Sequence, residues 1–208
     1  MPEGPSIDID IRIAVAGWRT ALPNPNAAIR KAVRAALAAE LPRGASTSLS
    51  ILLTDDAEMR KLNAGWRAKD KPTNVLSFPA ENAVDPANPP DFLGDVALGL
   101  ATCRREAREQ GKPFANHVAH LTVHGVLHLL GYDHMDDEQA EAMEPLETDI
   151  LASLGIADPY TPAVKAVAKK KTAKKKTTKK KTASKTKKKS AVKKKAVKSP
   201  AKKRSAAR

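Results

Sequence analysis

The stretch HVAHLTVHGVLHLLGYDH, from His117 to His134, holds all five histidines of a chain of 208 residues. His124 and His128 stand four residues apart, so on a helix they lie one above the other on the same face. Gly131 can end that helix in a left-handed conformation and turn the chain back. The turn would bring His134 up as a third ligand. Three neutral imidazoles that leave a fourth position open are typical of a catalytic zinc site.

Two details of this window limit the interpretation. His120 stands four residues before His124 and could form the pair in place of His128. His117 and His120 share nearly one helical face, where they could support the ligands, face a substrate or pack in the core. The helix of many zinc proteases reads H-E-x-x-H, with the glutamate as general base, whereas Gly125 occupies that position here. The pattern therefore favours a metal site and argues against a protease of this type.

The rest of the chain alternates between strand and helix patterns. Apolar residues surround the histidines on most sides of the segment ending near Leu130, which predicts a buried central helix. Alternation from Ile7 to Ile13 predicts a strand, and residues 26–40 have the apolar spacing of an amphipathic helix. The order predicts an α+β fold, a small mixed sheet of about four strands packed with about five to six helices. Further strands are expected at residues 48–53, 75–78 and 93–98, and further helices at 57–66, 102–110, 113–130 and 136–154, the last kinked or split at Pro145.

The net charge of +14 is the sum of two opposite parts. Residues 161–208 hold 22 of the 37 Lys and Arg and none of the 23 Asp and Glu, which leaves residues 1–160 with a net charge of −8. The lysine runs lack the apolar residues that would offset the entropy of ordering, so we expect a disordered tail after one globular domain, residues 1–160. From Lys165 to Arg208 the tail would bind polyphosphate without reading sequence. It is then either a tether to ribosomal RNA or the ribosome, or a solvating appendage.

Composition also bears on the compartment. Cys103 is the only cysteine, so an intramolecular disulfide is impossible, and we expect a small buried or half-buried residue rather than a nucleophile. The chain starts without the basic and apolar regions of a secretion signal. No apolar run approaches the roughly 20 residues that span a bilayer. We expect a cytoplasmic protein that binds no membrane and is a monomer or a weak oligomer.

Three blocks of the sequence resemble one known family. The string HGVLHLLGYDH, His124–His134, resembles the signature of the YbeY family of bacterial endoribonucleases. RAKDKPTNVLSF, Arg67–Phe78, is similar to its block R-x-K-D-x-P-T-[DN]-V-L-S-F, and Leu93–Val96 is similar to its L-G-D strand. Downstream, Glu144–Leu154 and Asp158–Tyr160 look like its closing helix and end. The resemblance covers about residues 7–160, with the blocks in the family's order.

The resemblance implies a function and a site. It implies one zinc ion per chain, held by His124, His128 and His134, and an essential arginine, Arg67. It also implies a single-strand-specific, metal-dependent endoribonuclease that matures the 3′ end of 16S ribosomal RNA and acts in ribosome quality control, with the small ribosomal subunit as partner. Zinc lowers the pKa of bound water from about 15.7 to about 7 and polarises a phosphoryl oxygen. A guanidinium binds phosphate oxygens bidentately and stabilises transition-state charge, so His124 and Arg67 are the expected catalytic residues.

Several alternatives remain at this stage. Arg67, Lys69 and Lys71 form a basic run that we expect to bind RNA, although taken by itself the run could be a solvated loop. Asp133 could orient an imidazole N–H from outside the ligand shell, act as a base, or satisfy the turn after Gly131. The nucleophile is either a zinc hydroxide or the RNA 2′-hydroxyl. Two other classes of protein stay open: a zincin-like metallopeptidase, and a noncatalytic ribosome- or nucleic-acid-binding module with a structural metal.

Overall fold

The computed structural model describes residues 4–80 and 84–161. Four strands form one sheet in the order β1-β2-β4-β3. β1 (Ser6–Ile13), β2 (Ser46–Thr54) and β4 (Phe92–Gly99) run parallel, and β3 (Val75–Pro79) pairs antiparallel with β4 at the edge. The described helices are α1 (Gly17–Ala21), α2 (Pro25–Glu40), α3 (Asp56–Arg67), α4 (Leu100–Glu109), α5 (Phe114–Leu129) and α6 (Asp137–Ser153). The predicted α+β class is confirmed; the predicted disorder of the tail concerns residues that lie outside this description, apart from Thr161.

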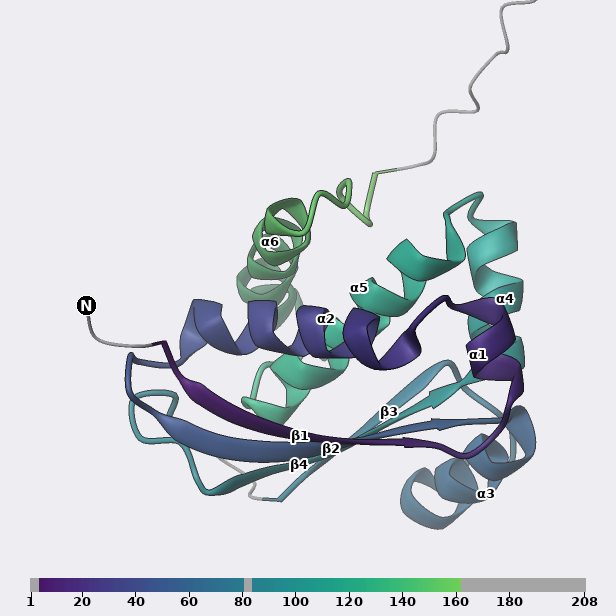
Figure 1. Ribbon diagram of the computed structural model, residues 1–208, viewed down its shortest axis with the longest axis horizontal. Helices are drawn as coiled ribbons and strands as arrows, with labels where there is room; N and C mark the ends of the chain where they lie inside the picture. Colours follow the sequence, from purple (N-terminus) through teal and green to yellow (C-terminus); the bar gives the residue numbers. More distant parts are fainter. Residues whose placement is uncertain (1–3, 81–83, 162–208) are drawn as a thin grey trace, which may run out of the picture. The chain divides into compact units, whose positions relative to one another are not determined.

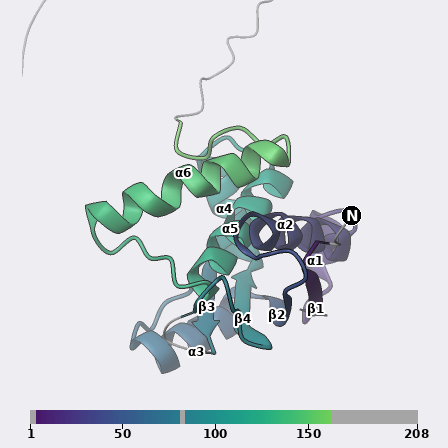
Figure 2. The same ribbon diagram turned by 90° about the vertical axis from the view of Figure 1, so that its left-hand side faces the viewer.

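Helices cover both faces of the sheet. Figure 1 shows α2, α5 and α6 on one side of the strands and α3 on the other, and the turned view in Figure 2 shows the same layers. Successive side chains of a strand point to opposite faces, so β4 serves two cores. Val96 and Leu98 belong to the large core with α2 and α5, and Ala97 packs with Met59 of α3 in the small one.

The histidine-bearing helix α5 is the central element of the large core. It packs against α2, α4 and α6 and against strands β3 and β4. Its C-terminus is closed by two backbone hydrogen bonds, from Gly131 N–H to the carbonyl of His128 and from Tyr132 N–H to the carbonyl of Leu127, each 3.1 Å long. This is the Schellman arrangement, which needs a left-handed residue at its first non-helical position. Gly131 supplies it with φ of +92°.

Two local features differ from expectation. The segment Gly17–Ala21 forms α1, a helix that we did not predict because five residues are too few for an apolar period. Of the kink or split predicted at Pro145, the split is wrong, because α6 runs unbroken from Asp137 to Ser153 with Pro145 inside it; the kink stays a prediction. Proline removes the hydrogen bond to the carbonyl of Glu141, and since both residues are exposed, water can satisfy that carbonyl.

The described helices have one further property. None of those within residues 4–80 and 84–161 is both long and apolar enough to pass through a lipid bilayer.

Candidate metal centre

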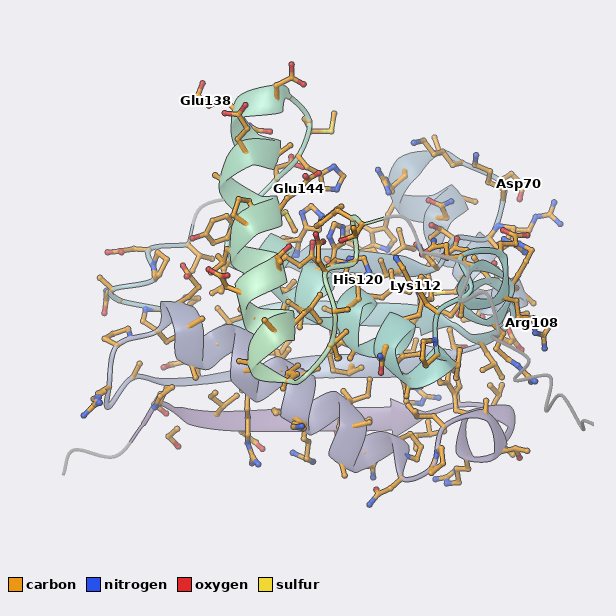
Figure 3. The ribbon with its side chains drawn as sticks, turned by 90° about the horizontal axis from the view of Figure 1, so that it is seen from above. Asp70, Arg108, Lys112, His120, Glu138 and Glu144 are labelled. Atoms are coloured by element: carbon orange, nitrogen blue, oxygen red, sulfur yellow. The ribbon has the colours of Figure 1, made fainter. Side chains whose placement is uncertain are left out.

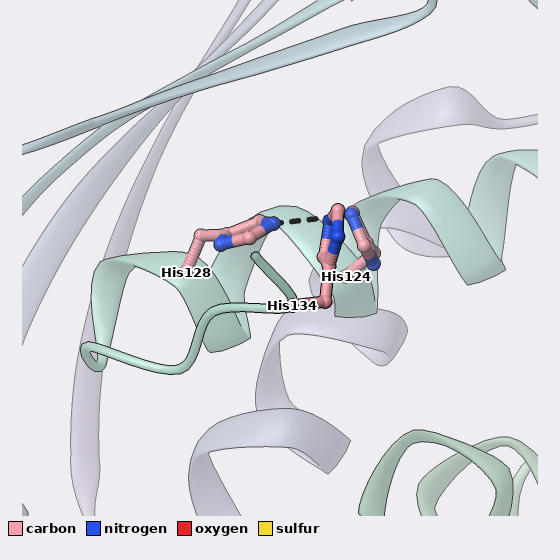
Figure 4. A group of neighbouring side chains, drawn as sticks. All are labelled: His124, His128 and His134. Carbon is pink, nitrogen blue, oxygen red and sulfur yellow. Dashed lines mark hydrogen bonds between the residues drawn. The ribbon is translucent and has the colours of Figure 1, made fainter. Parts of the chain in front are cut away.

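The structure brings His124, His128 and His134 together. Each offers one ring nitrogen, and these three nitrogens lie within 4.8 Å of one another. The Nε2 atoms of His124 and His128 are 3.1 Å apart. Figure 4 shows the first two rings leaving α5 and the ring of His134 returning from the loop after the helix. The turn at Gly131 is therefore what converts a pair of helical histidines into a trio.

The trio fits a zinc-sized ion. Two tetrahedral ligands bonded at about 2.0–2.1 Å lie roughly 3.3 Å from each other, close to the 3.1 Å between the two Nε2 atoms. Burial lowers the pKa of His128, and the neighbouring His124 lowers that pKa further. His128 is therefore a neutral imidazole at neutral pH, which is the form that binds a metal.

The second ring nitrogen of each helical histidine, His124 and His128, also contacts an oxygen atom. Nδ1 of His128 lies 2.8 Å from the carbonyl oxygen of Tyr132, and Nδ1 of His124 lies 3.4 Å from Oε1 of Glu147. Metal-bound histidines usually donate their second N–H to a carbonyl or carboxylate, which fixes the tautomer and the direction of the ring. Both contacts leave Nε2 free to face the shared point between the three rings.

Glu147 is a buried carboxylate supplied by α6. Its side chain has 0% exposure, its Oε1 lies 3.2 Å from Nε2 of His120, and its Oε2 accepts a hydrogen bond from the hydroxyl of Tyr160. Burial opposes ionisation of Glu147, yet its contacts with His120 and His124 lower the pKa to about 2. Figure 3 shows His120 beside α6, whose exposed residues include Glu138 and Glu144. Glu147 is thus ionised in the protein's interior and connects α6 to the histidine helix.

His120 and Glu147 could also form a cation site with His124, because their ligand atoms lie within 4.8 Å of one another. In the structure, the carboxylate already contacts a nitrogen of each imidazole. We therefore interpret His120 and Glu147 as support for the first trio.

The trio lines a pocket of about 1010 Å³. Arg67, the last residue of α3, lines the same pocket, together with Ser77 of β3 and Asp95 of β4. α3 and α5 pack on opposite faces of the sheet, and they share this pocket because β3 is the edge strand. Arg67 and the three histidines therefore line one pocket, although the sequence separates Arg67 from His124 by more than fifty residues.

Other residues predicted for the site lie elsewhere or make other contacts. Lys69 and Lys71 are exposed and are not among the residues lining the pocket; the carbonyl of Lys71 accepts a hydrogen bond from Nδ2 of Asn63 at 2.7 Å. Asp133 lines the pocket, but its Oδ1 accepts the backbone N–H of His134 at 2.8 Å. That contact favours the turn interpretation of Asp133, while Tyr132 and Glu147 contact the helical imidazoles. The basic tail from Lys165 to Arg208 lies outside the described residues.

Sequence reasoning missed two residues of this site. Glu147 sits among many acidic residues of α6 that a helix wheel assigns to solvent, and only the packing of α6 against α5 reveals its burial. Trp66 is 72% exposed at the pocket. In the sequence, Trp66 stands out only because it is a large aromatic residue directly before the basic run.

Comparisons with known proteins agree with one another. Residues 19–155 match the family described as endoribonuclease YbeY. The chain is 52% identical to the endoribonuclease YbeY of Paramagnetospirillum magneticum over 159 residues, which are 74% of this chain and 96% of that protein. It is 54% identical to the endoribonuclease YbeY of Alkalilimnicola ehrlichii over 76% of this chain and 93% of that protein. A Bradyrhizobium protein of the same name is 47% identical over 77% of this chain and 96% of its own length.

Proposed function

The chain belongs to the endoribonuclease YbeY family, and on that premise we propose that it is a zinc-dependent endoribonuclease that cleaves single-stranded ribosomal RNA. One observation carries the proposal: three imidazole nitrogens within 4.8 Å of one another line the same pocket as Arg67. The nitrogens suit a divalent cation and the guanidinium suits a phosphodiester. The two halves of a metal-assisted phosphodiesterase site would therefore share one pocket.

His124, His128 and His134 would hold the ion, which supplies a water of lowered pKa and polarises a phosphoryl oxygen when bound. Arg67 binds two phosphate oxygens and stabilises the charge that develops on them in the transition state. Tyr132 and Glu147 keep the helical imidazoles directed at the ion through their second nitrogens. Asp133 also lines the pocket, so its carboxylate is the candidate for a proton-transfer role.

The natural substrate and surroundings belong to the same proposal. We assign the 3′ end of 16S ribosomal RNA as substrate, the small ribosomal subunit as partner, and ribosome quality control as the wider role. We further assign a monomer or weak oligomer that works in the cytoplasm. The 22 Lys and Arg of residues 161–208 would hold the acidic domain on polyanionic RNA by counterion release, without reading its sequence. Lys69 and Lys71 would add weaker contacts outside the pocket.

The experiment compares the wild type with His124→Ala and Arg67→Ala on labelled ribosomal RNA and on casein. RNA cleavage that disappears in both variants supports the proposal, provided that Arg67→Ala still binds one metal ion per chain. Casein cleavage would indicate the metallopeptidase instead. Bound metal without turnover on either substrate would indicate a binding module with a structural metal.

One observation disfavours the peptidase. A Cβ atom at Gly125 would lie 2.7 Å from Cγ1 of Val96 and 3.1 Å from Oγ of Ser77. The position at which zincins carry their glutamate therefore meets the sheet in this fold, and a general base has no room there.

A further inference from the structure

Exposed apolar side chains gather at the pocket of the metal centre. Among residues 4–80 and 84–161, four large hydrophobic side chains are exposed: Trp66 (72%), Met135 (79%), Tyr160 (43%) and Phe92 (39%). Trp66, Met135 and Phe92 all line the pocket that also contains Arg67 and the three histidines. Exposed apolar surface that collects in one place usually marks a binding site. A ligand that suits these apolar side chains and Arg67 together must offer both apolar surface and negative charge.

Trp66 is the residue best placed to bind such a ligand. It lies in the last turn of α3, directly before Arg67. Its ring is 5.3 Å from the ring of Phe78 between centroids, at an interplanar angle of 55°. Phe78 belongs to β3 and packs against the small core of Met59, Leu76 and Ala97. The indole is therefore supported from the sheet while most of the Trp66 side chain stays exposed at the rim of the pocket.

A nucleobase is the apolar group that accompanies a phosphate in RNA. Bases stack on exposed aromatic rings regardless of sequence, because every base has a π face. In a duplex both faces are covered by neighbouring base pairs, whereas an unpaired base can be splayed onto a protein side chain. An aromatic ring that lines the same pocket as a phosphate-binding arginine would thus select single strands without reading their sequence.

We propose that Trp66, supported by Phe78, is a stacking platform for an unpaired nucleobase of the RNA strand whose phosphate Arg67 binds. The proposal rests on the proposed endoribonuclease function and supplies a physical source for its preference for single strands. It makes Trp66 a binding residue that sets substrate class, and it leaves the chemistry to the metal centre and Arg67.

The chain offers a direct optical test. It has two tryptophans, of which Trp18 is 0% exposed and Trp66 is 72% exposed. The probes are a 2′-O-methyl single-stranded oligonucleotide, the same strand in a duplex, and inorganic polyphosphate, which carries charge without bases. We expect the single strand to quench the emission of the full chain and to shield it from iodide. The duplex and polyphosphate should do neither, even where they bind the lysines of 161–208.

Variants separate stacking from general apolar contact. Trp66→Leu removes the ring and keeps apolar volume, and we expect it to weaken binding of the single strand by about tenfold, in line with the loss of one stacked base. Trp66→Phe keeps a ring and should bind within about threefold of the wild type. Met135→Ala is the matched control, because Met135 lines the same pocket without a π face. Since both side chains are exposed, thermal unfolding should be unchanged in all three.

Three outcomes would overturn the stacking platform. The first is Trp66→Leu with unchanged affinity and unchanged Michaelis constant on a cleavable single strand. The second is an equal loss of single-strand affinity in Met135→Ala, which would show that general apolar contact, not stacking, explains the binding. The third is wild-type dimerisation that Trp66→Leu abolishes without any effect on RNA, which would make the patch a protein interface. If the wild type binds the single strand through Trp66 but cleaves no RNA, the platform stands and the proposed enzymatic function fails.

Discussion

The carboxylate of Glu147 lies 3.4 Å from Nδ1 of His124. Glu147 comes from α6 and His124 from α5, so this contact connects the candidate metal centre to the last described helix. The hydroxyl of Tyr160 donates to the other carboxylate oxygen and fixes its position. A carboxylate that receives the second N–H of a metal-binding histidine sets its tautomer and raises its basicity. The end of the described region thus contributes to the site by holding one of its imidazoles.

Replacement of Glu147 by Gln should weaken zinc binding by about 10- to 100-fold, because the amide can no longer stabilise an imidazole N–H through a full negative charge. Competition with a chromophoric chelator measures the affinity. Glu144→Gln is the control, since Glu144 lies on the exposed side of the same helix and should leave affinity unchanged. If Glu147→Gln binds zinc as tightly as the wild type, the contact between Glu147 and His124 is only a structural ion pair.

Gly125 marks where α5 approaches the sheet most closely. A Cβ there would lie 2.7 Å from Val96, 3.1 Å from Ser77 and 3.3 Å from Val75. Val96 is fully buried on a central strand, so it has little freedom to move. Moreover, the Ser77 hydroxyl donates to the carbonyl of Gly125 at 2.9 Å, which would resist a shift of the helix.

Gly125→Ala should therefore lower the free energy of unfolding by about 1–3 kcal/mol through overpacking, despite the gain of up to about 1 kcal/mol that Ala brings to a helix interior. Urea unfolding measures the difference. Gly65→Ala in α3 is the matched control, because no atom lies within 4 Å of the added methyl, and it should be neutral or stabilising. A Gly125→Ala protein as stable as Gly65→Ala would contradict the close approach.

The clustering of the three histidines was predictable because its signal is local. A spacing of four residues places His124 and His128 on one face, and Gly131 signals the turn that returns His134. The strands and the longer helices likewise follow from apolar periods. Arg67 is a different case, since only the family resemblance indicated its role; the fold unites it with the histidines because α3 and α5 meet at the edge strand.

What the sequence could not reveal depends on tertiary packing. In the sequence, Glu147 has the same local surroundings as its exposed acidic neighbours, and its burial results from the packing of α6 against α5. The three roles left open for Asp133 show the same limit, because the sequence alone could not choose among them; in the structure its carboxylate accepts the His134 N–H. The predicted split at Pro145 was wrong because Pro145 and Glu141 are both exposed, so water can satisfy the freed carbonyl and the helix continues past the proline.

Cys103 should be inert in the folded protein. Its side chain is fully buried, and desolvation, followed by the charge of Glu106, raises the pKa of the thiol far above its ordinary value. Only the thiolate reacts with disulfide reagents. We therefore expect labelling by a thiol reagent such as dithionitrobenzoate to require unfolding, and to proceed fast in urea. Rapid labelling of the native protein would contradict the burial of this residue in the large core.

Replacement of Arg67 by Ala should lower kcat/KM on single-stranded RNA by about 10²–10³-fold, as for the loss of one transition-state donor. Arg67→Lys should recover only part of the loss, because an ammonium cannot bind two phosphate oxygens in the fork geometry. Zinc content should stay at one ion per chain in both variants. Lys69→Ala is the control: it removes a neighbouring charge that does not line the pocket and should cost little. A loss in Lys69→Ala as large as in Arg67→Ala would show that only general positive charge matters.

The basic tail should raise the affinity for RNA without changing the rate of the chemical step. Because 22 cationic residues of 161–208 accompany a domain with a net charge of −8, a chain that lacks residues 162–208 should bind single-stranded RNA more weakly at low salt. The slope of log affinity against log salt should also become shallower, by roughly 0.7 for each phosphate that the tail no longer neutralises. The kcat at saturating RNA should not change, since Arg67 and the three histidines remain. Filter binding across a salt series and single-turnover cleavage measure the two quantities; an unchanged salt slope would show that the tail does not bind the substrate.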